Sequence, residues 1–185
     1  MRTLEALVEL LALDRLPRTG WLQAGVSSPE CIAAHSQGVA LIALALGPAV
    51  HPPLDVDRCV SLAVTHDAPE AWLGDLPKTA ARLLPKGAKK VAEERAAFDL
   101  LGGLSGTAHA RWKEYEEGES REARFVRCCD RLALGVRGLG YRRACQGDLS
   151  TFRETVEQLA CEEFEPCSRL RDELLEAWAQ PISQC

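Results

Sequence analysis

The chain has 185 residues, of which 46% are hydrophobic, and its formal net charge is −5. This length can bury a core, and the apolar content excludes a disordered chain. The basic residues are scattered among acids and give no electrostatic footprint for a nucleic-acid polymer, and no stretch approaches the roughly 20 apolar residues of a membrane span. We therefore expect one soluble domain over residues 1–185.

The eight cysteines include no Cys-x-x-Cys pair, and several occupy apolar positions of helical patterns. Buried free thiols explain them better than a disulfide framework or a zinc knuckle. The N-terminus carries Glu5 and Glu9 on an amphipathic pattern and is not typical of a signal peptide. These features predict a cytoplasmic protein.

Helical periodicity dominates the first half of the chain. A first helix is predicted near 3–13, with Leu4, Leu7, Val8 and Leu11 on one buried face. A loop follows to about residue 29. The second helix begins at Pro29 and Glu30 and continues to about Leu46, and the third begins after Asp55 as its cap and runs into His66.

Helical patterns also dominate the second half of the chain. A charged helix is predicted at 86–101, ended by Gly102 and Gly103, with the inward residues Val91, Ala92, Phe98 and Leu101. A short helix carrying Trp112 and Tyr115 precedes a long helix capped by Ser120, whose inner face reads Ala123, Phe125, Val126, Cys129, Asp130, Ala133 and Val136. Two packing helices, near 150–163 and 167–178, close the chain. Because no segment alternates with a period of two, we predict an all-α helical bundle.

Four polar residues interrupt the apolar faces of these helices: His35, the adjacent pair His66 and Asp67, and Asp130. Buried polar groups without partners cost roughly a few kcal/mol each, so these residues need a common partner. Two imidazoles and two carboxylates suit a borderline divalent ion such as Mn, Fe, Co, Ni or Zn. Taken alone, the His-Asp pair is more simply a charged helix end.

Other polar residues lie near these positions. Glu70 is four residues after His66 and would share its helical face, as a ligand or as a base acting on a metal-bound water. Trp21 and Arg18 are predicted either to bind a base and a phosphate or to pack the loop on the core. Asp75 either binds its own backbone or accepts a hydrogen bond from a ligand hydroxyl.

The joined motifs resemble the HD-domain metal-dependent phosphohydrolases, and within them the 5'-deoxynucleotidases. The resemblance covers most of the chain, from Leu16-Pro17-Arg18-Thr19-Gly20-Trp21 through His35 and His66-Asp67-Ala68-Pro69-Glu70 to Asp130. It implies a single HD domain that removes the 5'-phosphate from deoxynucleoside monophosphates. Relatives are often dimers, so a homodimer is an open expectation.

The resemblance also implies residue roles. His35, His66, Asp67 and Asp130 would hold one divalent transition metal, and Glu70 would orient or deprotonate the attacking water. Trp21, Arg18 and Asp75 would bind the substrate. The chain departs from the family twice, because Gly20 replaces an arginine beside the tryptophan and Ala34 replaces an acid before His35.

Three rival interpretations stay open. The same site would serve a deoxynucleoside triphosphate hydrolase acting on dATP. A non-catalytic nucleotide sensor would use the metal only to hold the helices together. A purely structural bundle would carry these histidines by coincidence and bind no transition metal.

Overall fold

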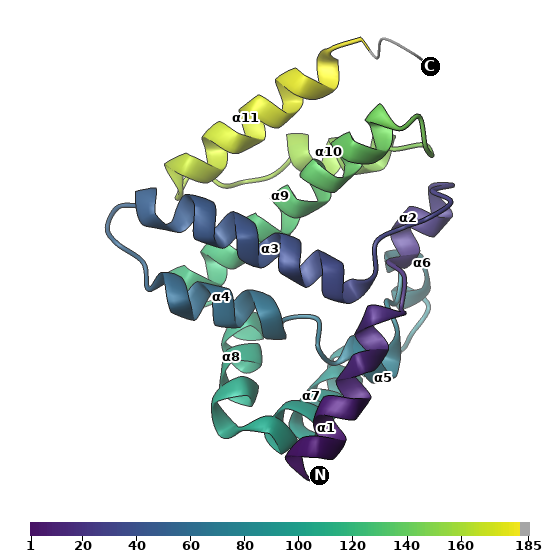
Figure 1. Ribbon diagram of the computed structural model, residues 1–185, viewed down its shortest axis with the longest axis vertical. Helices are drawn as coiled ribbons and strands as arrows, with labels where there is room; N and C mark the ends of the chain where they lie inside the picture. Colours follow the sequence, from purple (N-terminus) through teal and green to yellow (C-terminus); the bar gives the residue numbers. More distant parts are fainter. Residues whose placement is uncertain (182–185) are drawn as a thin grey trace.

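The computed structural model describes residues 1–181. Over this range the elements are helices, and the strand-like pairing is one isolated antiparallel bridge between Pro17 and Cys31. The predicted all-α fold class is therefore confirmed. Figure 1 shows α1 at one end of the molecule and α11 at the other, with α3 crossing the middle.

Three helices form the centre and contact one another in every pairing: α3 (Ile32–Leu46), α4 (Val56–Thr65) and α9 (Arg121–Arg143). Their facing side chains include Leu62, Phe125 and Val126, which have no exposed surface. Burying side chains of this size stabilises the fold by about 1.5–3 kcal/mol each. This packing fixes the three helices that carry the polar residues singled out above.

The remaining helices surround this centre. They are α1 (Thr3–Leu10), α2 (Thr19–Gln23), α5 (Glu70–Leu73), α6 (Lys78–Ala81), α7 (Ala88–Leu104), α8 (Gly106–Glu117), α10 (Ser150–Glu157) and α11 (Glu165–Ala179), with the 3-10 turns η1 (Leu11–Asp14) and η2 (Gly47–Ala49). α10 and α11 pack on α9, and α7 packs on α8. α2, α5 and α6 are short helices in stretches where no helix was predicted.

Two predicted helix caps are confirmed. The Asp55 carboxylate accepts a hydrogen bond from Arg58 N at 3.0 Å, and the Ser120 hydroxyl accepts one from Ala123 N at 3.1 Å. The predicted start of α3 at Pro29 was wrong by three residues, because the helix begins at Ile32 with Cys31 as its N-cap. The preceding segment is extended and pairs with the loop, where Arg18 N donates to Glu30 O at 3.0 Å.

The predicted buried face of α1 was wrong. Leu4, Leu7, Val8 and Leu11 are each at least half exposed, and Ala6 is the buried residue of this helix. α1 packs against α7 through Ala6, and a Cβ added at Gly103 would lie 3.2 Å from the Ala6 Cβ. The small residues on both helices permit this close approach, which leaves the leucines on the opposite side.

Similar corrections apply to α7 and α9. α7 continues through Gly102 and Gly103 to Leu104, because Ser105 both ends it and caps α8. Val91 and Phe98, predicted to be buried, are exposed, while Leu101 is buried as predicted. Val136 on α9 is also largely exposed.

One stretch, Ile32–Ala49, is long and apolar enough to cross a membrane by length and composition alone. It comprises α3 and η2. In the fold, α3 packs on both α4 and α9 and carries the buried His35. These contacts account for its apolar character as a central helix of the bundle.

Among residues 1–181, six cysteines are free, and five of them, Cys59, Cys128, Cys129, Cys161 and Cys167, are buried. The prediction of buried thiols is confirmed for these five. Cys31, also free, is half-buried and caps α3. Cys145 differs from the prediction because it is disulfide-bonded. Cys185 lies outside the described residues.

Candidate metal centre

The two histidines and Asp130 meet although they come from three different helices. His35 lies in the second turn of α3, His66 caps the C-terminus of α4, and Asp130 lies midway along α9. The Nε2 atom of His35 is 3.0 Å from Oδ1 of Asp130. One nitrogen or oxygen atom from each residue lies within 4.8 Å of the other two, and all three residues are buried.

The ring of His66 is oriented by the backbone. Its Nδ1 is 2.7 Å from the carbonyl oxygen of Ala63. A carbonyl oxygen only accepts hydrogen bonds, so Nδ1 carries the proton and Nε2 of the neutral ring presents its lone pair to the centre. Nε2 is buried without a hydrogen-bond partner and lies 3.2 Å from Oδ2 of Asp67, a second electron-rich atom.

Such an arrangement attracts a cation. Burial lowers the pKa of His66, but the neighbouring Asp67 carboxylate outweighs burial and raises the pKa to about 9. For Asp130, burial raises the pKa, whereas the hydrogen bond from His35 and the nearby imidazoles lower it to about 2. An orphaned imidazole nitrogen beside two ionised carboxylates is the donor set of a divalent metal site. The residues present therefore fit a divalent metal ion.

Asp67 completes the set, and Arg18 contacts it directly. Its Oδ2 atom lies 3.8 Å from His35 Nε2 and 2.8 Å from Nη1 of Arg18. Burial raises the pKa of Asp67, but the positive charges of His66 and Arg18 lower it well below its usual range. Arg18 is the nearest guanidinium to the centre although it lies two residues before the family position, which Gly20 occupies.

Glu70 begins α5, directly after the His66-Asp67 pair. It is buried, and its Oε2 atom has no hydrogen-bond partner and lies 3.9 Å from Nη1 of Arg18. Burial and the negative charge of Asp67 raise the pKa of Glu70 to about 9. A carboxyl group with a strongly raised pKa beside a metal site is typical of a proton-transferring residue.

Asp75 and Trp21 hold the loop that carries Arg18. The Asp75 carboxylate accepts a short hydrogen bond from Thr19 N, and its carbonyl oxygen accepts one from the Thr19 hydroxyl at 2.7 Å. Its other carboxylate oxygen lies 3.9 Å from Arg18. Trp21 is only 1% exposed, and its indole Nε1 donates to Oε1 of Glu30 at 3.0 Å.

Glu30 is the residue whose role the sequence pattern did not reveal. Its Oε1 atom lies 3.8 Å from Nδ1 of His35, and its Oε2 atom accepts a hydrogen bond from Nε of Arg137 at 2.8 Å. Glu30 is thus an acidic neighbour of His35, whose preceding residue is Ala34. At 3.8 Å this contact is electrostatic and is not a hydrogen bond.

One cavity of about 660 Å³ joins these groups. Its lining includes seven of the eight predicted site residues: Arg18, Trp21, His66, Asp67, Glu70, Asp75 and Asp130. His35 lies behind them, against Asp130. Lys89, Arg131 and Phe152 also line the cavity, and in the sequence they lie on ordinary amphipathic patterns that indicate no role.

Proteins named 5'-deoxynucleotidases are similar to this chain in sequence. The human 5'-deoxynucleotidase HDDC2 is 33% identical over 133 residues, which cover 70% of this chain and 63% of that protein. The Schizosaccharomyces pombe 5'-deoxynucleotidase hdd1 is 31% identical over 77% of this chain and 75% of that protein. The matched region thus spans less than two thirds of the human relative.

The fold is also found among solved structures. The crystal structure of the PH0347 protein from Pyrococcus horikoshii OT3 has a TM-score of 0.83 and 30% sequence identity, covering 94% of this chain and 99% of that one. The HD domain family model matches residues 12–166. This match spans every residue of the centre described above, and the chain belongs to the HD domain family.

Proposed function

We propose that this protein is a metal-dependent phosphohydrolase that removes the 5'-phosphate from deoxynucleoside monophosphates. The observation that carries the proposal is the convergence of His66, Asp67 and Asp130 in one cavity with Arg18 and Glu70, with His35 directly behind Asp130. The names of the human and fission yeast relatives support the substrate class.

His35, His66, Asp67 and Asp130 would hold the ion, whose imidazole and carboxylate ligands suit Mn, Fe, Co, Ni or Zn. When bound, a divalent ion lowers the pKa of a coordinated water and polarises a phosphate oxygen. The Ala63 carbonyl oxygen holds the His66 ring in orientation through Nδ1, and the Glu30 carboxylate lies 3.8 Å from Nδ1 of His35. The orientation of the His66 ring is therefore set by the backbone of α4.

The remaining residues bind the substrate or accept the proton of the attacking water. Arg18 places a permanent positive charge beside Asp67, where it can bind the oxygens of a phosphate. In its ionised form the buried Glu70 carboxylate accepts the proton of the attacking water, and Asp75 presents a carboxylate oxygen for a sugar hydroxyl. Each of these side chains lines the same cavity.

The test is phosphate release by the purified protein, loaded separately with Mn, Co or Zn, from dAMP, AMP and dATP. We expect orthophosphate from dAMP and much less from AMP. Triphosphate release from dATP with no reaction of dAMP would replace the proposal by the triphosphate hydrolase. If no nucleotide reacts although the metal binds, the sensor interpretation would be favoured instead.

A further inference from the structure

The cavity has a second wall that the proposed reaction does not use. Beyond the charged groups around the metal centre, its lining includes Leu134 of α9 and Thr151, Phe152 and Thr155 of α10. This wall carries apolar groups and hydroxyls, and the adjoining Asp148 and Ser150 also line the cavity. A nucleotide has the same division, with charge at its phosphate and a flat, uncharged base at the other end.

Trp21 is unsuited to stack on a base although it lines the cavity. The Phe152 ring covers one of its faces, with 3.7 Å between ring centroids and 20° between planes. Tyr141 contacts it edge-on at 5.1 Å, and Glu30 holds its indole nitrogen. Only 1% of the Trp21 surface is exposed, so its indole ring supports the Phe152 ring that stacks on it.

Phe152 is the outer ring of this stack. It is only half-buried and lines the cavity. The neighbouring residue of α2 is Gly20, where an added Cβ would lie 3.5 Å from Cζ of Phe152, so no side chain from this position crosses the ring. A short series of contacts links Phe152 to the metal centre, through Trp21 and Glu30 to His35.

We propose that Phe152 is the platform on which the nucleobase of the substrate stacks. This inference rests on the proposed function and specifies how the substrate's base is held. Every base offers a π-face, and stacking on an aromatic ring discriminates little between bases. The protein is therefore expected to accept deoxynucleoside monophosphates with different bases, at similar kcat/KM.

The test compares dAMP with 2-deoxyribose 5-phosphate, which has the same phosphate and sugar but no base. For Phe152→Ala we expect kcat/KM for dAMP to fall about tenfold, mainly through KM, because a base–aromatic stack of ordinary strength is lost. The same variant should hydrolyse 2-deoxyribose 5-phosphate at the wild-type rate. Phe152→Tyr, which keeps a ring, should restore the activity on dAMP.

Leu149→Ala is the matched control. Leu149 packs in the same cluster as Trp21 but does not line the cavity, so its loss disturbs the packing without removing the platform. We expect this variant to change kcat/KM for dAMP and for 2-deoxyribose 5-phosphate by the same factor. An equal loss on both substrates in Phe152→Ala, or no loss on either, would overturn the inference.

Binding distinguishes this inference from the proposed function. Titration calorimetry of the Mn-loaded protein with dAMP should show weaker binding in Phe152→Ala than in wild type or Phe152→Tyr. Such a difference in a protein that hydrolyses neither substrate would support the platform and contradict the phosphohydrolase. Equal binding by wild type and Phe152→Ala would overturn the platform even if turnover is found.

Discussion

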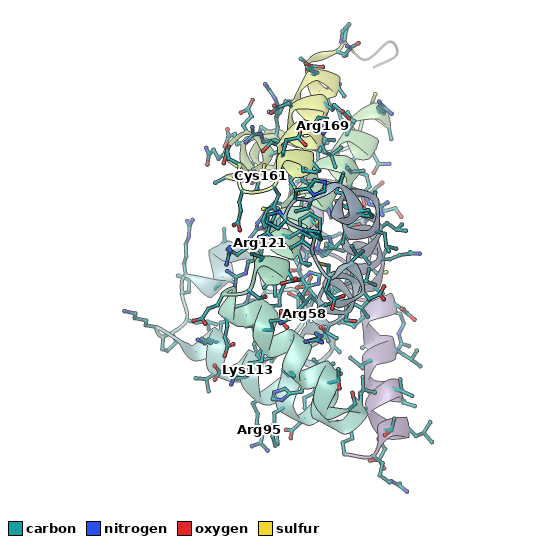
Figure 2. The ribbon with its side chains drawn as sticks, turned by 90° about the vertical axis from the view of Figure 1, so that its left-hand side faces the viewer. Arg58, Arg95, Lys113, Arg121, Cys161 and Arg169 are labelled. Carbon is teal, nitrogen blue, oxygen red and sulfur yellow. The ribbon has the colours of Figure 1, made fainter. Side chains whose placement is uncertain are left out.

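Charged residues on the outer surface and those in the metal centre are arranged in opposite ways. On the face shown in Figure 2, cations lie beside carboxylates: Arg95 binds Asp99 at 2.8 Å, Arg58 binds Glu114 at 2.9 Å, and Arg169 binds Glu165. In the centre, His66 Nε2 and Glu70 Oε2 are buried without hydrogen-bond partners. Surface pairs are complete and contribute little, whereas these two buried atoms have no hydrogen-bond partner among the described residues.

This difference indicates where function lies. Water solvates a surface charge whether or not it is paired, so such pairs add about 0–1 kcal/mol of stability. An incompletely satisfied buried group costs more, and a catalytic role or a bound ion is one reason for its presence. The following predictions test this contrast, from the largest expected effect to the smallest.

Asp130→Ala removes one carboxylate from the buried cluster. We expect loss of bound metal and a fall of more than about 100-fold in phosphate release, since even residues that only orient metal ligands change affinity by 10–100-fold. Metal content after dialysis and dAMP turnover would be measured together. A variant that keeps its full metal content would remove Asp130 from the ligand set.

Glu70→Gln changes the buried carboxylate to a neutral group of the same shape. The metal should be retained while kcat falls by about 10²–10⁴, the usual contribution of a proton-transferring residue. Elemental analysis and steady-state kinetics would separate the two effects. Wild-type turnover in this variant would exclude Glu70 from the reaction.

Arg18→Gln removes the cation that contacts Asp67. We expect kcat/KM for dAMP to fall by about 10-fold or more, because a hydrogen bond to a charged group contributes about 1.5–3 kcal/mol. Arg18→Lys should recover part of this activity because it keeps the charge but loses the planar fork. An unchanged KM and kcat in Arg18→Gln would show that the phosphate binds elsewhere.

The metal-free protein should lose stability as pH rises from about 6.5 to about 9. The folded-state pKa values of Glu70 and His66 are both raised, to about 9, so the folded protein binds protons that the unfolded chain releases at lower pH. The stability contributed by these protons is lost as the pH rises through the pKa values of the folded state. Thermal melting in a chelator across this range would measure it.

Glu70→Gln is the control for this pH dependence. This substitution removes one of the two groups whose pKa is raised. The melting temperature of the variant should therefore vary less steeply with pH than that of the wild type. A wild-type melting temperature that stays constant or rises from pH 6.5 to 9 would contradict the assignment.

Arg95→Ala breaks an exposed i,i+4 pair on α7. We expect a change of about 0.5 kcal/mol or less in the free energy of unfolding, a shift of at most about 2 °C in Tm, and unchanged turnover. Urea unfolding would measure the change. A loss comparable to that of a core substitution would remove the contrast between surface and centre.

The sequence by itself determined the local features. Asp55 and Ser120 cap their helices as predicted, because a cap depends on residues three positions apart. The four polar residues of the centre were recognisable because a histidine or aspartate among apolar helical positions requires a partner. The HD family resemblance, confirmed by the family match, rests on these local motifs.

The tertiary structure decided which helical face is covered and which distant residues meet. Leu4 and Leu7 of α1 are exposed because close packing of Ala6 against Gly103 turned the opposite face inward. Glu30 lies beside His35, and Phe152 lies on Trp21, through contacts across long sequence separations. The apolar periodicity of the sequence indicates that one face of a helix is apolar. Only the packing of whole helices determines what lies against that face.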